Sequence, residues 1–166
     1  DKLEPTTPDQ NNRSTASSTW HLGDDVDAEI RELYVESYFG DALVRVGKQQ
    51  VVWGQADGLK VLDVVNPQSY REFILDDFDD SRIPLWSLNV EFPVGDESLV
   101  QVIWLPDTTY NDIPETGSTF AFSSPRIVPK AVSGFSIVNK DAAKLNNPGS
   151  DSDFGGRFST FLGGWD

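Results

Sequence analysis

The chain has 166 residues, and its 13 Lys and Arg against 27 Asp and Glu give a formal net charge of −14. A surface with this excess of negative charge repels a phosphate backbone, so we expect no nucleic-acid partner. The chain has neither Cys nor Met, which excludes disulfides and a cysteine nucleophile and predicts a processed form or a piece of a longer chain.

Hydrophobic runs in the sequence are short. None approaches the roughly 18 to 20 consecutive apolar residues of a membrane-spanning helix. A strand of a membrane barrel needs only about 9 to 11 residues in which apolar and polar side chains alternate. The sequence therefore excludes spanning by helices but not by strands.

The N-terminal residues 1–28 are rich in Ser, Thr, Asn, Asp and Pro, with Trp20 and Leu22 as the only anchors. Such a composition buries little apolar surface, so we expect a flexible loop or tail. Residues 29–166 are predicted to form the folded part, an antiparallel β-meander.

The first predicted hairpin begins at residue 29. EIRELYVESYF (29–39) places Leu33, Val35 and Phe39 on one face, which favours a strand over the alternative helix. A Gly40-Asp41 turn then leads into ALVRVGKQQVVW (42–53). In this second strand Lys48 and Gln50 share the parity of the valines, so a bulge or a polar patch is expected.

The same pattern returns after residue 84. LWSLNVEF (85–92) and SLVQVIWL (98–105) alternate strictly and are joined by PVGDE, which predicts a second hairpin. GGRFSTFLGGW (155–165) is predicted as a fifth strand, weakened by its glycines.

The connections between these strands alternate in length. They are short at 40–41 and 94–97 and long at 54–84 and 106–153. Tight turns on one side and long loops on the other are typical of outer-membrane barrels. The five tryptophans also lie near predicted strand ends, where barrels carry aromatic girdles, although a soluble sandwich core would use tryptophan as well. These are Trp20, Trp53, Trp86, Trp104 and Trp165.

One short helix is predicted inside the first long loop. Asn66 is a good N-cap and Pro67 suits the first helical position, after which SYREFIL can continue for two turns. Tyr70, Phe73 and Ile74 would share one side of this helix. A helix of this length is marginal alone, so it must dock on the rest of the protein.

Four carboxylates follow in LDDFDDSR (75–82). Calcium binds six to eight oxygen ligands from flexible chain, which makes it the candidate cation here. The alternatives are a solvated or arginine-paired acidic rim, or an electrostatic filter at a pore mouth. The candidate ligands are Asp76, Asp77, Asp79 and Asp80.

Enzymatic chemistry is not expected. The only histidine, His21, lies in the loose N-terminal segment, which argues against a His-based triad or metal cluster. WGQADGLK (53–60) lacks the ending of a phosphate-binding loop. We expect no cofactor apart from the candidate calcium.

Three motifs in this region resemble a known family. R-x-G-K-Q-x-x-x-W-G (45–54), D-x-x-N-P (63–67) and the acidic run into SRIP (81–84) are similar to the N-terminal barrel region of uncharacterised proteobacterial outer-membrane proteins. The resemblance covers residues 29–107 and, more weakly, the closing strand. It implies an architecture like that of porins and alginate exporters, with organic or hydrophobic solutes as cargo, and it brings no catalytic residues.

We therefore predict an all-β fold: an antiparallel meander from a partial outer-membrane-type barrel, with long loops and one short helix. The expected surroundings are the bacterial outer membrane, with a lipid bilayer and a small organic solute as partners. Loop 54–84 would fold inward as a gate, unless its polar residues only hold the loop together. The candidate gate or ligand-contact residues are Trp53, Gln55, Asp57, Arg71 and Arg82.

Five strands are too few to close a barrel, which leaves two open edges for a further chain or chains to satisfy. Two other functions remain open. A soluble, secreted all-β module could use the tryptophans to stack on sugars, and a self-assembling strand array could pair its free edges.

Overall fold

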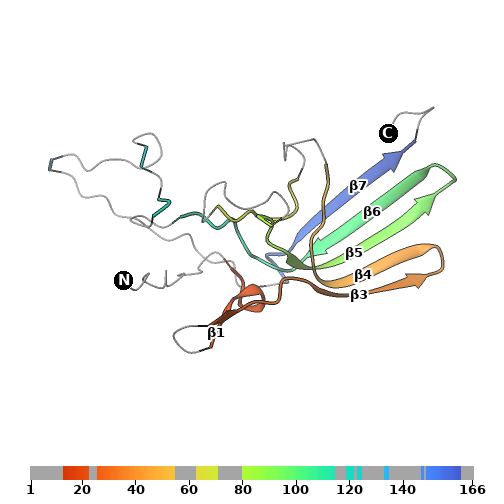
Figure 1. The fold of residues 1–166 in the computed structure, drawn as a ribbon. Coiled ribbons are helices and arrows are strands. Elements are labelled where there is room, and N and C mark those ends of the chain that lie inside the picture. Colours follow the sequence, from red (N-terminus) through yellow and green to blue (C-terminus); the bar gives the residue numbers. More distant parts are fainter. Residues whose placement is uncertain are drawn as a thin grey trace.

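The computed structural model of the chain is dominated by one five-stranded antiparallel sheet (Figure 1). It describes residues 13–22, 26–54, 63–70, 80–114, 119–121, 123–124, 133–134, 147 and 149–161. The strands are β3 (Leu33–Phe39), β4 (Ala42–Gln49), β5 (Leu85–Val94), β6 (Ser98–Leu105) and β7 (Asp153–Thr160). Each pairs with its neighbour in sequence, so the predicted all-β antiparallel meander is confirmed. The sheet does not close, because β3 and β7 each pair with only one described strand.

The N-terminal segment carries three small elements. They are the 3₁₀ helix η1 (Thr15–Ser17) and the two-stranded ribbon of β1 (Trp20–His21) and β2 (Asp27–Ala28). Within the part of the chain that the structure describes, η1 is the one helical element, and no helix has the length and apolarity to cross a membrane.

The two predicted tight turns lie at one end of the sheet, and the long connections leave from the other (Figure 1). Gly40 has a φ of 63° between β3 and β4, and Gly95 has a φ of 68° between β5 and β6. Positive φ is what glycine supplies to such hairpin turns. Both long connections thus leave from, and return to, the same end of the sheet.

Several strand boundaries differ from the prediction. β3 begins at Leu33, and the helical alternative for this segment is wrong. β4 ends at Gln49, and its register with both neighbours runs without a bulge, so the interruption is the polar patch at Lys48. β7 begins at Asp153 and ends at Thr160, earlier than expected.

The start of the predicted helix at Asn66-Pro67 is wrong. Gln68 forms a β-bridge with Arg82, and Ser69 forms one with Asp112. The Asn66 side chain is not a cap, because it binds the backbone of two segments distant in sequence. The remainder of the predicted helix, 71–79, lies outside the described residues.

The two faces of the sheet differ sharply in chemistry. Direct partners such as Val35, Val46, Leu88, Trp104 and Phe154 share one face, which we call the apolar face. Its side chains are largely exposed, with 72% of Val35 and 76% of Phe154 accessible. The alternate positions point to the opposite face, which we call the polar face. It includes Glu36, Arg45, Asn89, Glu91, Gln101 and Arg157.

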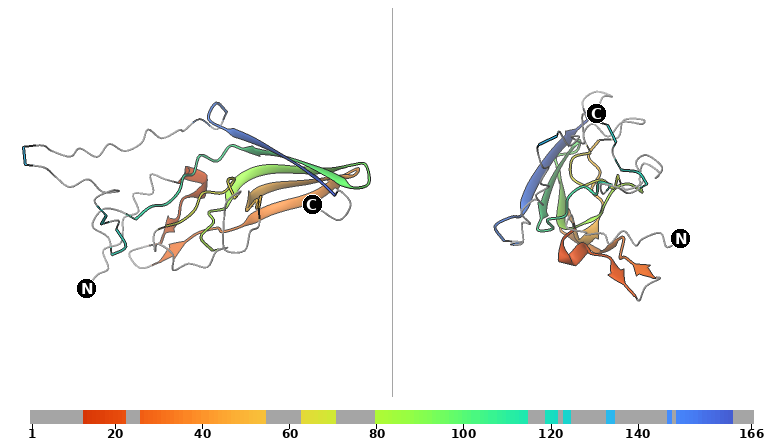
Figure 2. Two further views of the ribbon diagram at one scale, coloured as in Figure 1. Left: turned by 90° about the horizontal axis from the view of Figure 1, so that it is seen from above. Right: turned by 90° about the vertical axis from the view of Figure 1, so that its left-hand side faces the viewer.

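The buried hydrophobic cluster lies on the polar face, near the long-loop end. It consists of Val51, Val65, Leu85, Ile103 and Leu105, with Trp53 packed against it. The three strand residues of the cluster, Leu85, Ile103 and Leu105, have the parity of the polar face. Segment 63–70 (yellow) lies along one side of the curved sheet in Figure 2. The chain that returns from the strands therefore covers the polar face, while the apolar face is left uncovered by this cluster.

Candidate functional site

The polar face is organised around Gln101 on β6. Its amide donates to the carboxylate of Glu91 at 3.0 Å and to the side-chain oxygen of Asn89 at 3.1 Å. Asn89 in turn donates to the same Glu91 oxygen at 3.1 Å. Strand alternation places these groups together, because Glu91 is the direct partner of Gln101. The network fixes a carboxylate among amide donors on the polar face of the sheet.

Trp53 joins this network from the chain that leaves β4. Its indole N–H donates to the Gln101 side-chain oxygen at 2.7 Å. The indole ring also lies over Gly155 of β7, where an added Cβ would come within 2.8 Å of the ring. Segment 51–54 therefore folds back over the polar face and reaches the far strand of the sheet.

Two arginines extend the polar face on either side of Gln101. On β4, Arg45 pairs with the Glu36 carboxylate, and its guanidinium lies 4.8 Å from the centre of the Tyr34 ring. On β7, Arg157 is the direct partner of Gln101. Arg157 forms no hydrogen bond or ion pair with another described residue, so its guanidinium is uncommitted within that part of the chain.

A cavity of about 310 Å³ opens on this face. The volume lies at the lower end of the range of about 300 to 1,000 Å³ that is usual for small-molecule sites. Polar and apolar side chains share the lining, which is Arg45, Gln50, Val51, Val52, Asn89, Glu91, Leu99, Gln101, Arg157 and Ser159.

The three sequence motifs meet behind the cavity. The Asn66 side chain accepts from the Val51 backbone N–H at 2.8 Å and donates to the Ile83 carbonyl at 2.9 Å. Arg82 donates to the Asp63 carboxylate at 2.5 Å, and both side chains are buried. These contacts link the end of β4, segment 63–70 and the start of β5, so the motif residues build the returning loop.

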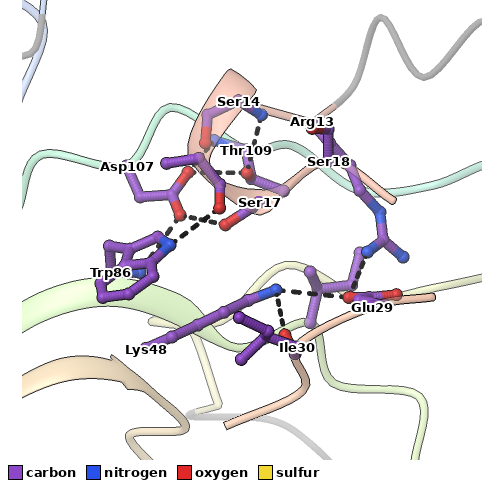
Figure 3. Close-up of polar contacts among 12 residues, drawn as sticks. Arg13, Ser14, Ser17, Ser18, Glu29, Ile30, Lys48, Trp86, Asp107 and Thr109 are labelled. Carbon is purple, nitrogen blue, oxygen red and sulfur yellow. Dashed lines mark hydrogen bonds and ion pairs between the residues drawn. The ribbon is translucent and has the colours of Figure 1, made fainter. Parts of the chain in front are cut away.

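A second polar cluster docks the N-terminal segment on the long-loop end of the sheet (Figure 3). Lys48, which is 1% exposed, donates to the Ile30 carbonyl at 2.7 Å and lies 3.3 Å from the Glu29 carboxylate. Arg13 pairs with Glu29 at 2.5 Å and with Asp112 at 3.2 Å. The polar patch of β4 is thus buried by this segment.

Asp107 completes the docking. One carboxylate oxygen accepts from the Ser17 hydroxyl at 2.5 Å and from the Trp86 backbone N–H at 3.1 Å. The other accepts from the Thr109 hydroxyl at 2.7 Å. The Trp86 indole donates to the Ala16 carbonyl at 2.9 Å (Figure 3). All these groups are engaged with one another, which gives this cluster a structural role.

The predicted gate residues have different positions. Trp53 lies on the polar face, where it donates to the cavity residue Gln101, and its role at a gate stays a prediction. Arg82 is buried with Asp63 away from the cavity lining, which matches the alternative that it holds the loop together. Gln55, Asp57 and Arg71 lie outside the described residues.

The candidate calcium ligands are only partly described. Asp80 is exposed and pairs with Arg31 at 2.6 Å. Asp76, Asp77 and Asp79 lie outside the described residues. Among residues that are described, no group of three or more acidic or His side chains is arranged to hold a metal. Calcium binding stays a prediction.

The residues of the central network were not among the sequence-based candidates. Asn89, Glu91 and Gln101 alternate with the apolar residues of their strands, so the polar parity was visible in the sequence. Arg45 belongs to the first motif, but the motif does not show which residues surround Arg45 in the fold. Arg157 could be found only by knowing that β7 pairs with β6.

Comparison with known proteins gives a family and no closer relative. A family model described as "Protein of unknown function (DUF1302)" matches residues 3–165. No curated protein and no solved structure matches the chain.

Proposed function

The chain belongs to DUF1302, a family described only as of unknown function, and we propose that it forms a segment of an outer-membrane β-barrel channel. The proposed role is the passage of organic or hydrophobic solutes across the bacterial outer membrane, without chemical reaction. The apolar face would contact lipid, and the polar face would line the passage.

One observation carries this proposal: in the central strands β5 and β6 the apolar side of the sheet is more exposed than the polar side. In a water-soluble sandwich the apolar faces pack together and the polar faces meet solvent. Here Val102 and Trp104 are 44% and 38% exposed, whereas Asn89 and Gln101 are buried. Lipid is the solvent in which this distribution is favourable, because strands of membrane barrels alternate apolar side chains outward with polar side chains inward.

The order of side chains along the apolar face supports the same proposal. Trp104 and Phe154 stack toward the long-loop end, with ring centroids 6.5 Å apart. Phe39, Phe92 and Phe158 lie toward the tight turns. One register row of aliphatic side chains, with Val44, Val90 and Val102, lies between them. Aromatic side chains that flank aliphatic ones on the outward face are a feature of barrels that span a bilayer.

The two free edges of the sheet can each pair with a strand of another chain. The outer edges of β3 and β7 pair with no described strand. Unsatisfied backbone groups are costly in lipid, so a barrel must close. We propose that further chain or chains pair with these two edges.

The two faces can be tested with single cysteines, because the chain contains none of its own. Val35→Cys and Phe158→Cys would report on the apolar face, and their neighbours Glu36→Cys and Ser159→Cys on the polar face. Each is labelled with NBD in phosphatidylcholine vesicles. We expect blue-shifted emission, quenched by acyl-chain nitroxides, only at the two apolar-face positions.

Equal emission and quenching on the two faces would contradict the proposal. A chain that is monodisperse in plain buffer, with Val35→Cys and Phe158→Cys protected from labelling, would favour the soluble binding module. Fibres with a cross-β diffraction pattern would favour the self-assembling strand array.

A further inference from the structure

We infer that the cavity on the polar face binds a small organic carboxylate with an apolar body, anchored by Arg157. This inference rests on the proposed function in taking the polar face as the path of the solute. It narrows the solute to a chemical class that neither the family nor the sequence motifs assign.

The charged side chains at the cavity differ in whether they have a partner. Arg45, Arg157 and Glu91 belong to the described lining, and Glu36, outside the lining, pairs with Arg45. With Glu36 included, two guanidinium groups stand against two carboxylates, so these groups carry no net charge. What the cavity offers an anion is the single guanidinium of Arg157.

The two arginines are not equivalent. The Arg45 guanidinium already pairs with Glu36 and lies over the Tyr34 ring. Arg157 forms no ion pair with another described residue, although it lines the same cavity. Its planar fork of donors matches a carboxylate with two parallel hydrogen bonds. Arg157 is therefore the residue that binds the carboxylate directly, and Arg45 adds only a weaker electrostatic attraction from farther away.

Glu91 does not neutralise Arg157. Glu91, Gln101 and Arg157 lie in one row across β5, β6 and β7. Two strand spacings, about 10 Å, separate the first and last backbones of this row. Between them, the Glu91 carboxylate is bound by the amides of Asn89 and Gln101. The carboxylate is thus committed to its neighbours, and the guanidinium stays available.

The apolar part of the lining selects the body of the ligand. Val51, Val52 and Leu99 lie among the polar lining residues. These side chains favour a ligand that places hydrocarbon beside its charged group. A cavity of about 310 Å³ has room for a small molecule. An aromatic carboxylate such as benzoate satisfies both requirements.

Binding can be followed at Trp53, whose indole N–H donates to the cavity residue Gln101. The 166-residue chain, ¹⁵N-labelled and folded in detergent micelles, is titrated with benzoate. The Trp53 indole signal is identified by its loss in Trp53→Phe. Benzyl alcohol serves as the uncharged ligand of similar shape, and benzylammonium as the cation.

We expect a saturable shift of the Trp53 signal with benzoate alone. Arg157→Gln should raise the Kd for benzoate by about tenfold or more, because it removes a charge-assisted contact. Arg157→Lys, which keeps the charge without the fork, should bind with intermediate affinity. The matched control is Arg31→Gln, which removes the same charge from an exposed pair with Asp80 outside the cavity. It should change the Kd by about twofold at most.

Three results would overturn the inference: no saturable shift, equal binding of benzyl alcohol or benzylammonium, or unchanged benzoate affinity in Arg157→Gln. A chain that inserts its apolar face into lipid and ignores benzoate refutes the carboxylate site alone. A chain that binds benzoate through Arg157 but fails the lipid test keeps the site and refutes the membrane role.

Discussion

At the scale of single residues, Gly155 allows the returning chain to lie against the sheet. Its hydrogen faces the Trp53 ring and the Ile103 side chain, both within 3.0 Å of where a Cβ would stand. The neighbouring Gly156 faces the other way and meets only ordinary contacts. The pair offers a substitution and its control on adjacent residues of one strand.

Gly155→Ala should lower the free energy of unfolding by about 1 to 3 kcal/mol, because the added methyl group overpacks the Trp53 contact. It should also move the Trp53 indole away from Gln101, which tryptophan fluorescence would register. Gly156→Ala should change stability by less than about 1 kcal/mol. Urea unfolding in detergent micelles measures both variants, and equal losses would contradict the packing described for Trp53.

The sequence predicted Trp53 at this site but not its partners. Its place next to a glycine and a turn suggested a functional loop, and the resemblance reinforced this. The importance of Gln101 and Arg157 depends on contacts between distant parts of the chain: 48 residues separate Trp53 from Gln101, and 56 separate Gln101 from Arg157. No local propensity records such a pairing.

At the scale of elements, strands were predictable and the loop was not. The alternation of apolar and polar residues predicted β5 and β6 and their register, because the two faces of these strands meet different surroundings. A shift of one residue in the register would move every side chain to the opposite face. The helix at Asn66-Pro67 failed for the opposite reason. Asn66 has the local chemistry of a cap, but its amide satisfies the backbone of Val51 and Ile83, and those partners are distant in sequence.

The returning loop depends on one buried ion pair. Arg82→Met leaves the buried Asp63 carboxylate without this partner, and one of its oxygens already has no hydrogen bond to a described residue. We expect stability to fall by about 3 to 5 kcal/mol. Arg31→Met breaks an exposed pair with Asp80 and should cost about 0 to 1 kcal/mol.

Urea titration monitored by tryptophan fluorescence would compare these two variants. A similar, small loss of stability in both variants would mean that Arg82 does not hold the loop in place. That result would favour its predicted role at the gate. A large loss in Arg82→Met with unchanged benzoate affinity in the folded fraction would separate the architecture of the loop from the binding of solute.

At the scale of the whole molecule, the central strands β5 and β6 bury their polar side more deeply than their apolar side, which is the reverse of a water-soluble sandwich. Hydrophobic alternation predicted that two faces exist, but alternation is the same in both kinds of protein. Only the asymmetry of the connections and the resemblance favoured the barrel. The distinction depends on what covers each face, which is a property of the assembled sheet.

This reversal predicts opposite responses to charge on the two faces. Val102 lies in the middle of the apolar face, and Val102→Arg should destabilise the chain in lipid vesicles by about 2 to 4 kcal/mol. Tyr38 lies on the polar face in the register row of Gln101, the residue next to Val102. Tyr38→Arg should cost less than about 1 kcal/mol.

Unfolding of the vesicle-inserted chain in urea measures both variants. Equal tolerance of arginine at the two positions would show that both faces meet water. The same pair in a lipid-free buffer provides the reference, because there the penalty at Val102 should disappear.

The meander has a kinetic consequence. β3 with β4, and β5 with β6, are joined by turns at Gly40 and Gly95, whereas β4 meets β5 only after the whole of segment 50–84. Closing a short turn costs far less chain entropy than closing a long one, and local contacts form sooner. Folding should therefore proceed by two independent hairpins that later zip together, with the slow step at the seam between β4 and β5.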